Sequence, residues 1–306
     1  MGTPEFAVEP LRALHESEHE VVAVVTAPDN PAGRGRKPRP SAVKQAALEL
    51  DLPVLQPEKL RDESFVQALK NLNADVFVVV AFRMLPKVVW TLPSKGTFNL
   101  HASLLPNYRG AAPIHWAVIN GEKESGVTTF MIDEEIDTGN ILLQEKTSID
   151  PNETTGSLYN RLMHLGAPLV VKTVDGLMKG DIAPISQDES AEMKPAPKIF
   201  REHQYIDVKE SAQAIHNHIR GLNPFPAPLL KLDHHGEQVE VKVADSAFIE
   251  RKQYPKALLH WLDDALVISR MDGDVLIKEI QWPGKRKMSV RDFKNGFAEY
   301  AELKTV

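Results

Sequence analysis

Two hydrophobic patterns alternate through the first half of the chain. Short runs that are apolar on both faces are typical of central parallel strands covered by helices. Amphipathic stretches between them predict the connecting helices. The expected strands are 21–26, 75–81, 97–100 and 126–132, and the expected helices are 42–51, 64–72, 114–119 and 154–179. This alternation predicts an α/β domain built on a Rossmann-like parallel sheet.

The pattern changes near residue 187. From 187 to 197 the periodicity is lost and acidic residues, Ser and Pro accumulate, which is typical of a linker. Beyond it, a helix is expected at 208–220, and short strands are expected at 229–232, 239–244, 266–269 and 275–280. Short strands separated by turns indicate a small β-barrel of the OB-like kind. We therefore expect a catalytic domain at 1–188, a linker at 189–201 and a smaller barrel domain at 202–306.

Composition narrows the classes of function. A chain of 306 residues is long for one hydrophobic core, which favours two domains. The absence of cysteine excludes disulfides, thiolate metal sites and cysteine nucleophiles. No run approaches the roughly 18 apolar residues needed to cross a bilayer, so a cytoplasmic protein is expected. His216 and His218 face different ways on a predicted helix, and no metal site is expected.

Charge is unevenly distributed. The 36 basic and 42 acidic residues give a net charge of -6, which disfavours general attraction to nucleic acid. Between residues 29 and 44, however, five basic residues oppose one acid, a local balance of +4: Arg34, Arg36, Lys37, Arg39 and Lys44 against Asp29. The segment 29–41 is rich in Gly and Pro and is expected to form no regular element. It is either a solvated surface loop or a phosphate-binding one.

The residues from 99 to 139 carry the candidate chemistry. Asn99 and His101 stand two apart at the end of a predicted strand, so their side chains project to the same side. The turn Asp137-Thr138-Gly139 can bring a carboxylate alongside them. In acyl transfer to an amine, Asn99 and a protonated His101 would hydrogen-bond the oxyanion, while Asp137 favours the charged imidazole. A serine nucleophile at Ser103 is the weaker alternative, and Ser103 is expected to hydrogen-bond its turn.

Three motifs in order carry a resemblance. Asn99-x-His101, Ser103-Leu104-Leu105-Pro106 and Asp137-Thr138-Gly139 together resemble the signature of the folate-dependent formyltransferases. The resemblance implies catalysis by Asn99, His101 and Asp137, with 10-formyltetrahydrofolate as cosubstrate. It also implies a set of residues against the folate, comprising Phe82, Arg83, Met84, Leu85, Ser103, Leu104, Leu105, Pro106 and Asp133. Arg83 departs from the smaller residue expected there.

Four further stretches, at 1–7, 28–36, 219–226 and 283–289, resemble the branch of this family that formylates methionyl-initiator tRNA. This implies that the basic segment enters the acceptor end of the tRNA, with Arg34 nearest, and that Phe6 lies near the methionyl side chain. A buried helix residue is an equal alternative for Phe6. The basic residues implied in tRNA contact are Arg34, Arg36, Lys37, Arg39, Lys285, Arg286 and Lys287; the last three also suit an ordinary charged turn. No metal, membrane or obligate protein partner is implied.

Two other functions are compatible with these motifs. A relative that formylates an amino-sugar nucleotide would share the three motifs and a similar second domain, but the basic segment argues against it. A noncatalytic RNA-binding relative is disfavoured because Asn99, His101 and Asp137 are all present. The resemblance also makes Gly2-Thr3-Pro4 the turn after a first strand. We therefore expect roughly six to ten residues ending in an apolar strand to precede Met1 in the native product.

Overall fold

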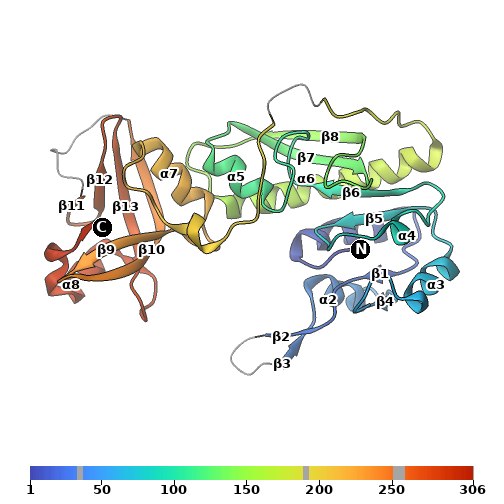
Figure 1. The fold of residues 1–306 in the computed structure, drawn as a ribbon, viewed down its shortest axis with the longest axis horizontal. Coiled ribbons are helices and arrows are strands. Elements are labelled where there is room, and N and C mark those ends of the chain that lie inside the picture. Colours follow the sequence, from blue (N-terminus) through green and yellow to red (C-terminus); the bar gives the residue numbers. More distant parts are fainter. Residues whose placement is uncertain (33–36, 189–192, 251–258, 306) are drawn as a thin grey trace. The chain divides into compact units, whose positions relative to one another are not determined.

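The computed structural model describes residues 1–32, 37–188, 193–250 and 259–305 (Figure 1). The chain packs as two compact units that are interleaved along the sequence. The first unit comprises Met1–Gly110, Ser125–Thr147 and Tyr159–Pro195, and the second comprises Ala111–Glu124, Ser148–Leu158 and Ala196–Val306. Because the units are interleaved, they set no single boundary, and the domain limits expected at 188 and 202 stay a prediction.

The first unit is an α/β structure with parallel strands, as predicted. Two short strands, β1 (Val24–Val25) and β4 (Val54–Leu55), pair in parallel, as do β5 (Phe77–Val80) and β6 (Thr97–His101). The next strand, β7 (Glu124–Met131), is antiparallel to β6, so the sheet contains parallel strands but is not parallel throughout. Its burial on both faces is the pattern of any central strand, so the sequence does not encode its direction. The sheet continues to β8 (Ile141–Ser148), which the sequence analysis missed.

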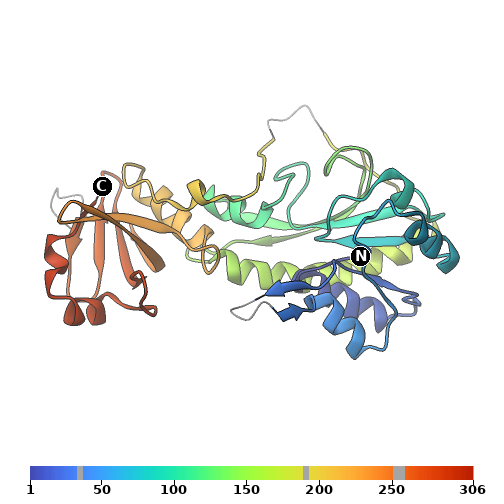
Figure 2. The same ribbon diagram turned by 60° about the horizontal axis from the view of Figure 1, so that its bottom comes forward.

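Helices surround these strands. Their bounds are η1 (Glu5–Ala7), α1 (Val8–His15), α2 (Ala42–Glu49), α3 (Glu63–Leu72), α4 (Lys87–Trp90) and α6 (Thr155–Lys179). The long helix α6 runs along one face of the sheet of β6 to β8 (Figure 2). Leu100 of β6 meets Gly166 of α6 so closely that an added Cβ on the glycine would lie 2.7 Å from the leucine. Since neighbouring strand residues point to opposite faces, Asn99 and His101 face away from α6.

The basic segment is partly regular, contrary to expectation. The strands β2 (Asn30–Ala32) and β3 (Lys37–Arg39) pair antiparallel. Pro31 stands opposite Pro38, and neither has an N–H to donate. In an antiparallel pair every second couple of residues exchanges no backbone hydrogen bonds, so two facing prolines fit there. The Gly and Pro content of the segment therefore gave no indication of this strand pair.

Met1 and Gly2 lie between β1 and β5. Gly2 donates its backbone amide to the carbonyl of Val25 at 3.0 Å, and Val80 donates to the carbonyl of Met1 at 2.9 Å. The Met1 amino group donates to the carbonyl of Val78 at 2.7 Å. A cavity of about 490 Å³ adjoins these residues, and its lining includes the apolar residues Val22, Val76 and Leu11 as well as polar ones such as Glu20. The expected apolar strand before Met1 stays a prediction.

The second unit is an antiparallel, barrel-like sheet, and the prediction of a small β-barrel is confirmed. Its strand order is β11-β12-β13-β10-β9-β15, with β14 paired to β13. The bounds are β9 (Leu229–His234), β10 (Glu237–Ile249), β11 (Leu259–Trp261), β12 (Leu266–Ser269), β13 (Asp274–Gln281), β14 (Met288–Ser289) and β15 (Lys304–Thr305). Buried aliphatic side chains such as Leu230, Val243 and Ile268 form its core. The sequence analysis missed β11, β14 and β15.

Helices of the second unit pack on this barrel and on one another. They are α5 (Pro113–Ile119), η2 (Arg201–Gln204), α7 (Ala212–Gly221), α8 (Val290–Gly296) and η3 (Ala298–Glu302). Helix α7 starts four residues later than predicted because the Ser211 side chain caps it, accepting from the backbone amide of Ala214 at 3.1 Å. Across the described residues of both units, no helix is both long and apolar enough to span a membrane.

Candidate active site

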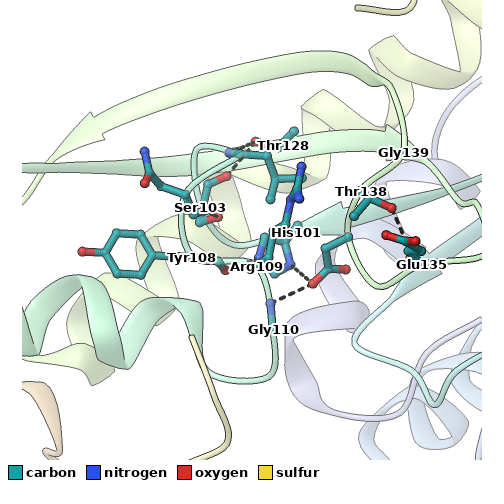
Figure 3. A network of polar contacts seen from close by, with 12 residues as sticks. His101, Ser103, Tyr108, Arg109, Gly110, Thr128, Glu135, Thr138 and Gly139 are labelled. Carbon is teal, nitrogen blue, oxygen red and sulfur yellow. Dashed lines mark hydrogen bonds and ion pairs between the residues drawn. The ribbon is translucent and has the colours of Figure 1, made fainter. Parts of the chain in front are cut away.

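His101 occupies the end of β6 and is 6% exposed. Its Nε2 lies 2.8 Å from the backbone carbonyl of Tyr108. A carbonyl can only accept, so Nε2 carries a proton and donates it. The proton that turns the ring into a cation must then sit on Nδ1, which faces Asp137 Oδ2 at 3.8 Å (Figure 3). The ring therefore presents Nε2 to the carbonyl of Tyr108 and Nδ1 to the carboxylate of Asp137.

The carboxylate of Asp137 reaches His101 from a loop. Strand β7 ends at Met131, which pairs with Phe98 and not with His101, so the segment 132–140 must bring Asp137 alongside. The Gly110 amide donates to Asp137 Oδ2 at 2.9 Å. Asp137 itself has a left-handed backbone with φ of 59°. Only glycine fits at position 139, because an added Cβ would lie 1.7 Å from the Met131 carbonyl oxygen.

Asn99 completes the group on the same face of β6. Its Oδ1 is buried and has no hydrogen-bond partner within the described residues. A buried polar atom without a partner is costly in a folded protein and is common where a ligand binds. Rotating the carboxamide exchanges its oxygen and its NH₂ group, so the same position can present either an acceptor or two donors.

The turn after β6 is held by its neighbours. Ser103 Oγ donates to the carbonyl of Asn107 at 2.7 Å. This hydrogen bond within the turn is the role expected for Ser103, in preference to that of a nucleophile. Thr128 Oγ1 donates to the carbonyl of Ser103 at 2.6 Å and accepts from the Leu105 amide at 3.2 Å. Gln144 Nε2 donates to the carbonyl of Leu105 at 2.9 Å. Sequence reasoning missed Thr128 and Gln144, because both are ordinary strand residues until the pairing is known.

The residues expected against the folate differ in exposure. Met84 is 68% exposed, whereas Leu85, Ser103 and Leu105 are buried. Phe82, Leu104 and Pro106 are half-buried. The Arg83 guanidinium donates to the backbone carbonyl of Glu58 at 2.9 Å and to that of Pro57. Asp133 is exposed and accepts from Thr138 Oγ1 at 2.8 Å. Their contact with folate stays a prediction.

The expected tRNA contacts divide into three groups. Arg34 and Arg36 lie outside the described residues. Lys37 belongs to β3, and Arg39 at the end of that strand is exposed. Lys285, Arg286 and Lys287 are exposed in the turn between β13 and β14, where Lys287 Nζ contacts Glu279 at 2.7 Å. These contacts with tRNA stay predictions.

Two other expected residues are held by neighbours in the first unit. Lys44 Nζ donates to Asp29 at 2.6 Å, and this hydrogen bond together with that from Gln56 lowers the pKa of Asp29. Phe6 is 4% exposed and packs edge-on against Tyr159 at 5.2 Å, which agrees with the alternative of a buried residue. Its contact with the methionyl side chain stays a prediction.

Metal-ligand side chains gather outside this site. In the described part of the chain, His234, His235 and Glu299 bring ligand atoms within 4.8 Å of one another. His234 Nε2 lies 3.1 Å from Glu299 Oε2, within hydrogen-bonding distance. His235 and Glu299 are exposed.

The chain matches known proteins over nearly its full length. Residues 1–174 match the family model described as Formyl transferase, and residues 198–298 match that described as Formyl transferase, C-terminal domain. A methionyl-tRNA formyltransferase of Bacteroides fragilis is 47% identical over 303 residues, which cover 97% of this chain and 94% of the relative. That of Parabacteroides distasonis is 47% identical over 311 residues, covering 99% and 96%.

A solved structure shares the fold at lower identity. It is the N-formyltransferase from Helicobacter canadensis in complex with folinic acid and dTDP-3-aminofucose. The TM-score is 0.65 and the identity is 22%, over 90% of this chain and 96% of that one. At this identity the likeness concerns the fold alone.

Proposed function

The chain belongs to the formyl transferase family, and on that premise we propose that it moves the formyl group of 10-formyltetrahydrofolate onto the amino group of methionyl-initiator tRNA. This reaction prepares the initiator for translation. It takes place where charged tRNA is made, so the proposal includes a cytoplasmic location. No step requires a metal ion or an obligate protein partner.

One observation carries the proposal on the structural side. His101 stands between the backbone carbonyl of Tyr108, which accepts a hydrogen bond from its Nε2, and the Asp137 carboxylate, which faces its Nδ1. Asn99 lies two residues before His101 in β6, so its carboxamide is on the same face of the strand as the imidazole. Two donors beside a carboxylate are what formyl transfer to an amine requires.

The chemistry follows from these groups. The methionyl amine attacks the formyl carbon, and the carbonyl oxygen becomes an oxyanion that the Asn99 amide and the His101 Nδ1–H can hydrogen-bond. Collapse of the intermediate breaks the bond from carbon to N10 of the folate. Over the whole reaction the amine loses one proton and N10 gains one. Asp137 stabilises the imidazolium while negative charge develops beside it.

Apolar side chains support the place proposed for the folate. Met84 and Ile136 are large and apolar, yet they are 68% and 60% exposed. Met84 belongs to the set of residues that the family resemblance places against the folate, and Ile136 follows Asp133 of that set by three positions. Exposed apolar groups beside polar ones are typical of a ligand site, because a flat aromatic ring can cover them.

The acceptor is proposed from the relatives and the basic segment. The two relatives named above act on methionyl-tRNA by name, and they match over nearly their full lengths. Arg34, Arg36, Lys37 and Arg39 would meet the phosphates of the acceptor stem. An amino-sugar nucleotide carries fewer phosphates and needs no such cluster.

The test is a formylation assay with 10-formyltetrahydrofolate and two acceptors, methionyl-initiator tRNA and an amino-sugar nucleotide. We expect turnover on the tRNA with kcat/KM at least roughly 10⁴ M⁻¹s⁻¹, within the ordinary range for enzymes. The matched control is the same tRNA without its methionyl group, which has no amine to formylate. Faster turnover of the sugar nucleotide than of the tRNA would contradict the proposal.

A further inference from the structure

A buried glutamine joins two loops of the candidate active site. Gln187 is 8% exposed. Its Oε1 accepts from Arg109 Nε at 3.0 Å and from Arg109 Nη2 at 2.8 Å. Its Nε2 donates to the backbone carbonyl of Asp137 at 2.9 Å and to that of Gly139 at 2.8 Å. A carboxamide has two acceptor positions and two N–H donors, so all four are in use.

The residues that Gln187 holds are adjacent to, or part of, the groups that fix the position of the Asp137 carboxylate. Arg109 directly precedes Gly110, whose amide donates to Asp137 Oδ2 at 2.9 Å. On the other side, the Gln187 amide holds the carbonyl of Asp137 itself. A left-handed backbone at an aspartate, here with φ of 59°, persists when its surroundings impose it. Gln187 therefore fixes both the loop that carries the carboxylate and the loop that carries its amide donor.

We propose that Gln187 is a positioning residue that sets the Asp137 carboxylate beside His101. The inference rests on the catalytic role proposed for Asp137. Gln187 acts on the reaction through that carboxylate, because its own polar atoms are all directed at Arg109, Asp137 and Gly139. Small displacements of a reacting or charge-stabilising group lower rates steeply, so the cost of losing Gln187 should appear in turnover.

A merely structural role is the alternative. A buried glutamine could stabilise the first unit without influencing the reaction, and its loss would then change stability alone. The two roles differ in how they combine with a change at Asp137. If Gln187 acts through the carboxylate, removing the carboxylate first leaves Gln187 with nothing to position, so the two effects do not multiply.

The experiment uses two substitutions with similar side-chain volume. Gln187→Met removes all four hydrogen bonds, whereas Gln187→Glu keeps the acceptors for Arg109 and loses both donors to the carbonyls. The control is Thr173→Val, which removes a buried hydroxyl that donates to the Leu169 carbonyl at 2.7 Å in α6. Each variant is made alone and together with Asp137→Asn, and kcat for formylation of methionyl-tRNA is measured at saturating substrates. Circular dichroism and thermal unfolding report the fold.

We expect both Gln187 variants to lower kcat by about 10- to 100-fold in the native background. In the Asp137→Asn background they should lower it by less than about threefold, while Thr173→Val should leave kcat within about twofold in both. If Gln187→Met does not fold, Gln187→Glu carries the test, because its side chain keeps the Arg109 pairing.

Two results would overturn the inference alone. They are a kcat within about twofold of the native value in both Gln187 variants, or losses that multiply with that of Asp137→Asn. If Asp137→Asn itself leaves kcat unchanged, the catalytic role proposed for Asp137 fails, and the positioning role fails with it. These outcomes separate a failure at Gln187 from a failure of the proposed site.

Discussion

The backbone amide of Gly110 donates to Asp137 Oδ2 at 2.9 Å. The same carboxylate oxygen lies 3.8 Å from His101 Nδ1, which is an ion-pair distance but too long for a hydrogen bond. In a charged ring, the Nδ1–H group therefore makes no hydrogen bond to the aspartate. It can donate a hydrogen bond to an oxyanion while the carboxylate, held by Gly110, still stabilises the cation.

This relationship predicts the effect of Asp137→Asn. The amide oxygen of asparagine can still accept from Gly110, but the negative charge that stabilises the imidazolium is gone. We expect kcat to fall by roughly 100-fold, the usual size of a lost electrostatic contribution at such a site. Steady-state formylation between pH 6 and 9 measures it. A variant with native turnover across that range would exclude the charge from the mechanism.

The donors on β6 give a second prediction. His101→Ala and Asn99→Ala should each fold and lose roughly 100-fold or more in kcat, because each removes a donor to the oxyanion. Single-turnover formylation with enzyme in excess of methionyl-tRNA isolates the chemical step. Folate binding, followed by fluorescence quenching, serves as the control for an intact pocket. A folded variant with native single-turnover rates would contradict the role of that residue.

Ser103 provides a third prediction, which separates two mechanisms. Its hydroxyl donates to the Asn107 carbonyl, so Ser103→Ala should cost one turn hydrogen bond, about 1 kcal/mol of stability. Turnover should fall by less than about tenfold. Loss of an attacking hydroxyl would instead lower kcat by about 10⁴-fold or more. A loss of that size, or a formylated serine in the intact mass of the enzyme, would restore the nucleophile alternative.

The sequence predicted what depends on local pattern. Apolar runs located β5 and β6, and the spacing of Asn99 and His101 placed both side chains on one face. What it missed depends on pairing between distant residues. The direction of β7 and the facing prolines 31 and 38 are invisible to a count of residue types. Gln187 begins the stretch 187–197, whose composition is typical of a linker, and that composition gives no sign of its hydrogen bond to Gly139, 48 residues earlier in the chain.

A fourth prediction concerns stability and pH. His216 in α7 is 1% exposed, and burial lowers its pKa to about 4 from 6.5. The folded state then stays neutral where the unfolded chain takes up a proton, so stability is complete above pH 6.5 and is lost as the pH falls toward 4. The loss amounts to about 3 kcal/mol. Urea unfolding of the full chain at pH 7.5 and 4.5 measures it.

The matching variant for this prediction is His216→Gln. Its amide can still bond Ser246 Oγ, which lies 3.0 Å from His216 Nδ1, but it does not titrate. The difference in unfolding free energy between the two pH values should shrink by most of those 3 kcal/mol. His164→Gln, at a 66% exposed side chain, is the control and should leave the difference as it is. An equal shrinkage in both variants would assign the pH dependence to general charge effects.

The last prediction tests the basic segment as the tRNA contact. Arg34, Arg36 and Lys37 replaced together by Gln should raise the KM for methionyl-tRNA by roughly tenfold or more while leaving folate binding unchanged, since phosphate contacts supply affinity without entering the chemistry. Each lost contact should also reduce the slope of log affinity against log salt by about one, because one fewer counterion is released. Filter binding of the tRNA between 50 and 300 mM KCl measures that slope.

The matched control replaces Lys59, Arg61 and Lys70, which are exposed on the first unit, and so changes the net charge by the same amount. Equal flattening of the slope in the two triple variants would mean that overall charge, and not this segment, attracts the tRNA; an unchanged slope in the first would place the tRNA elsewhere on the surface.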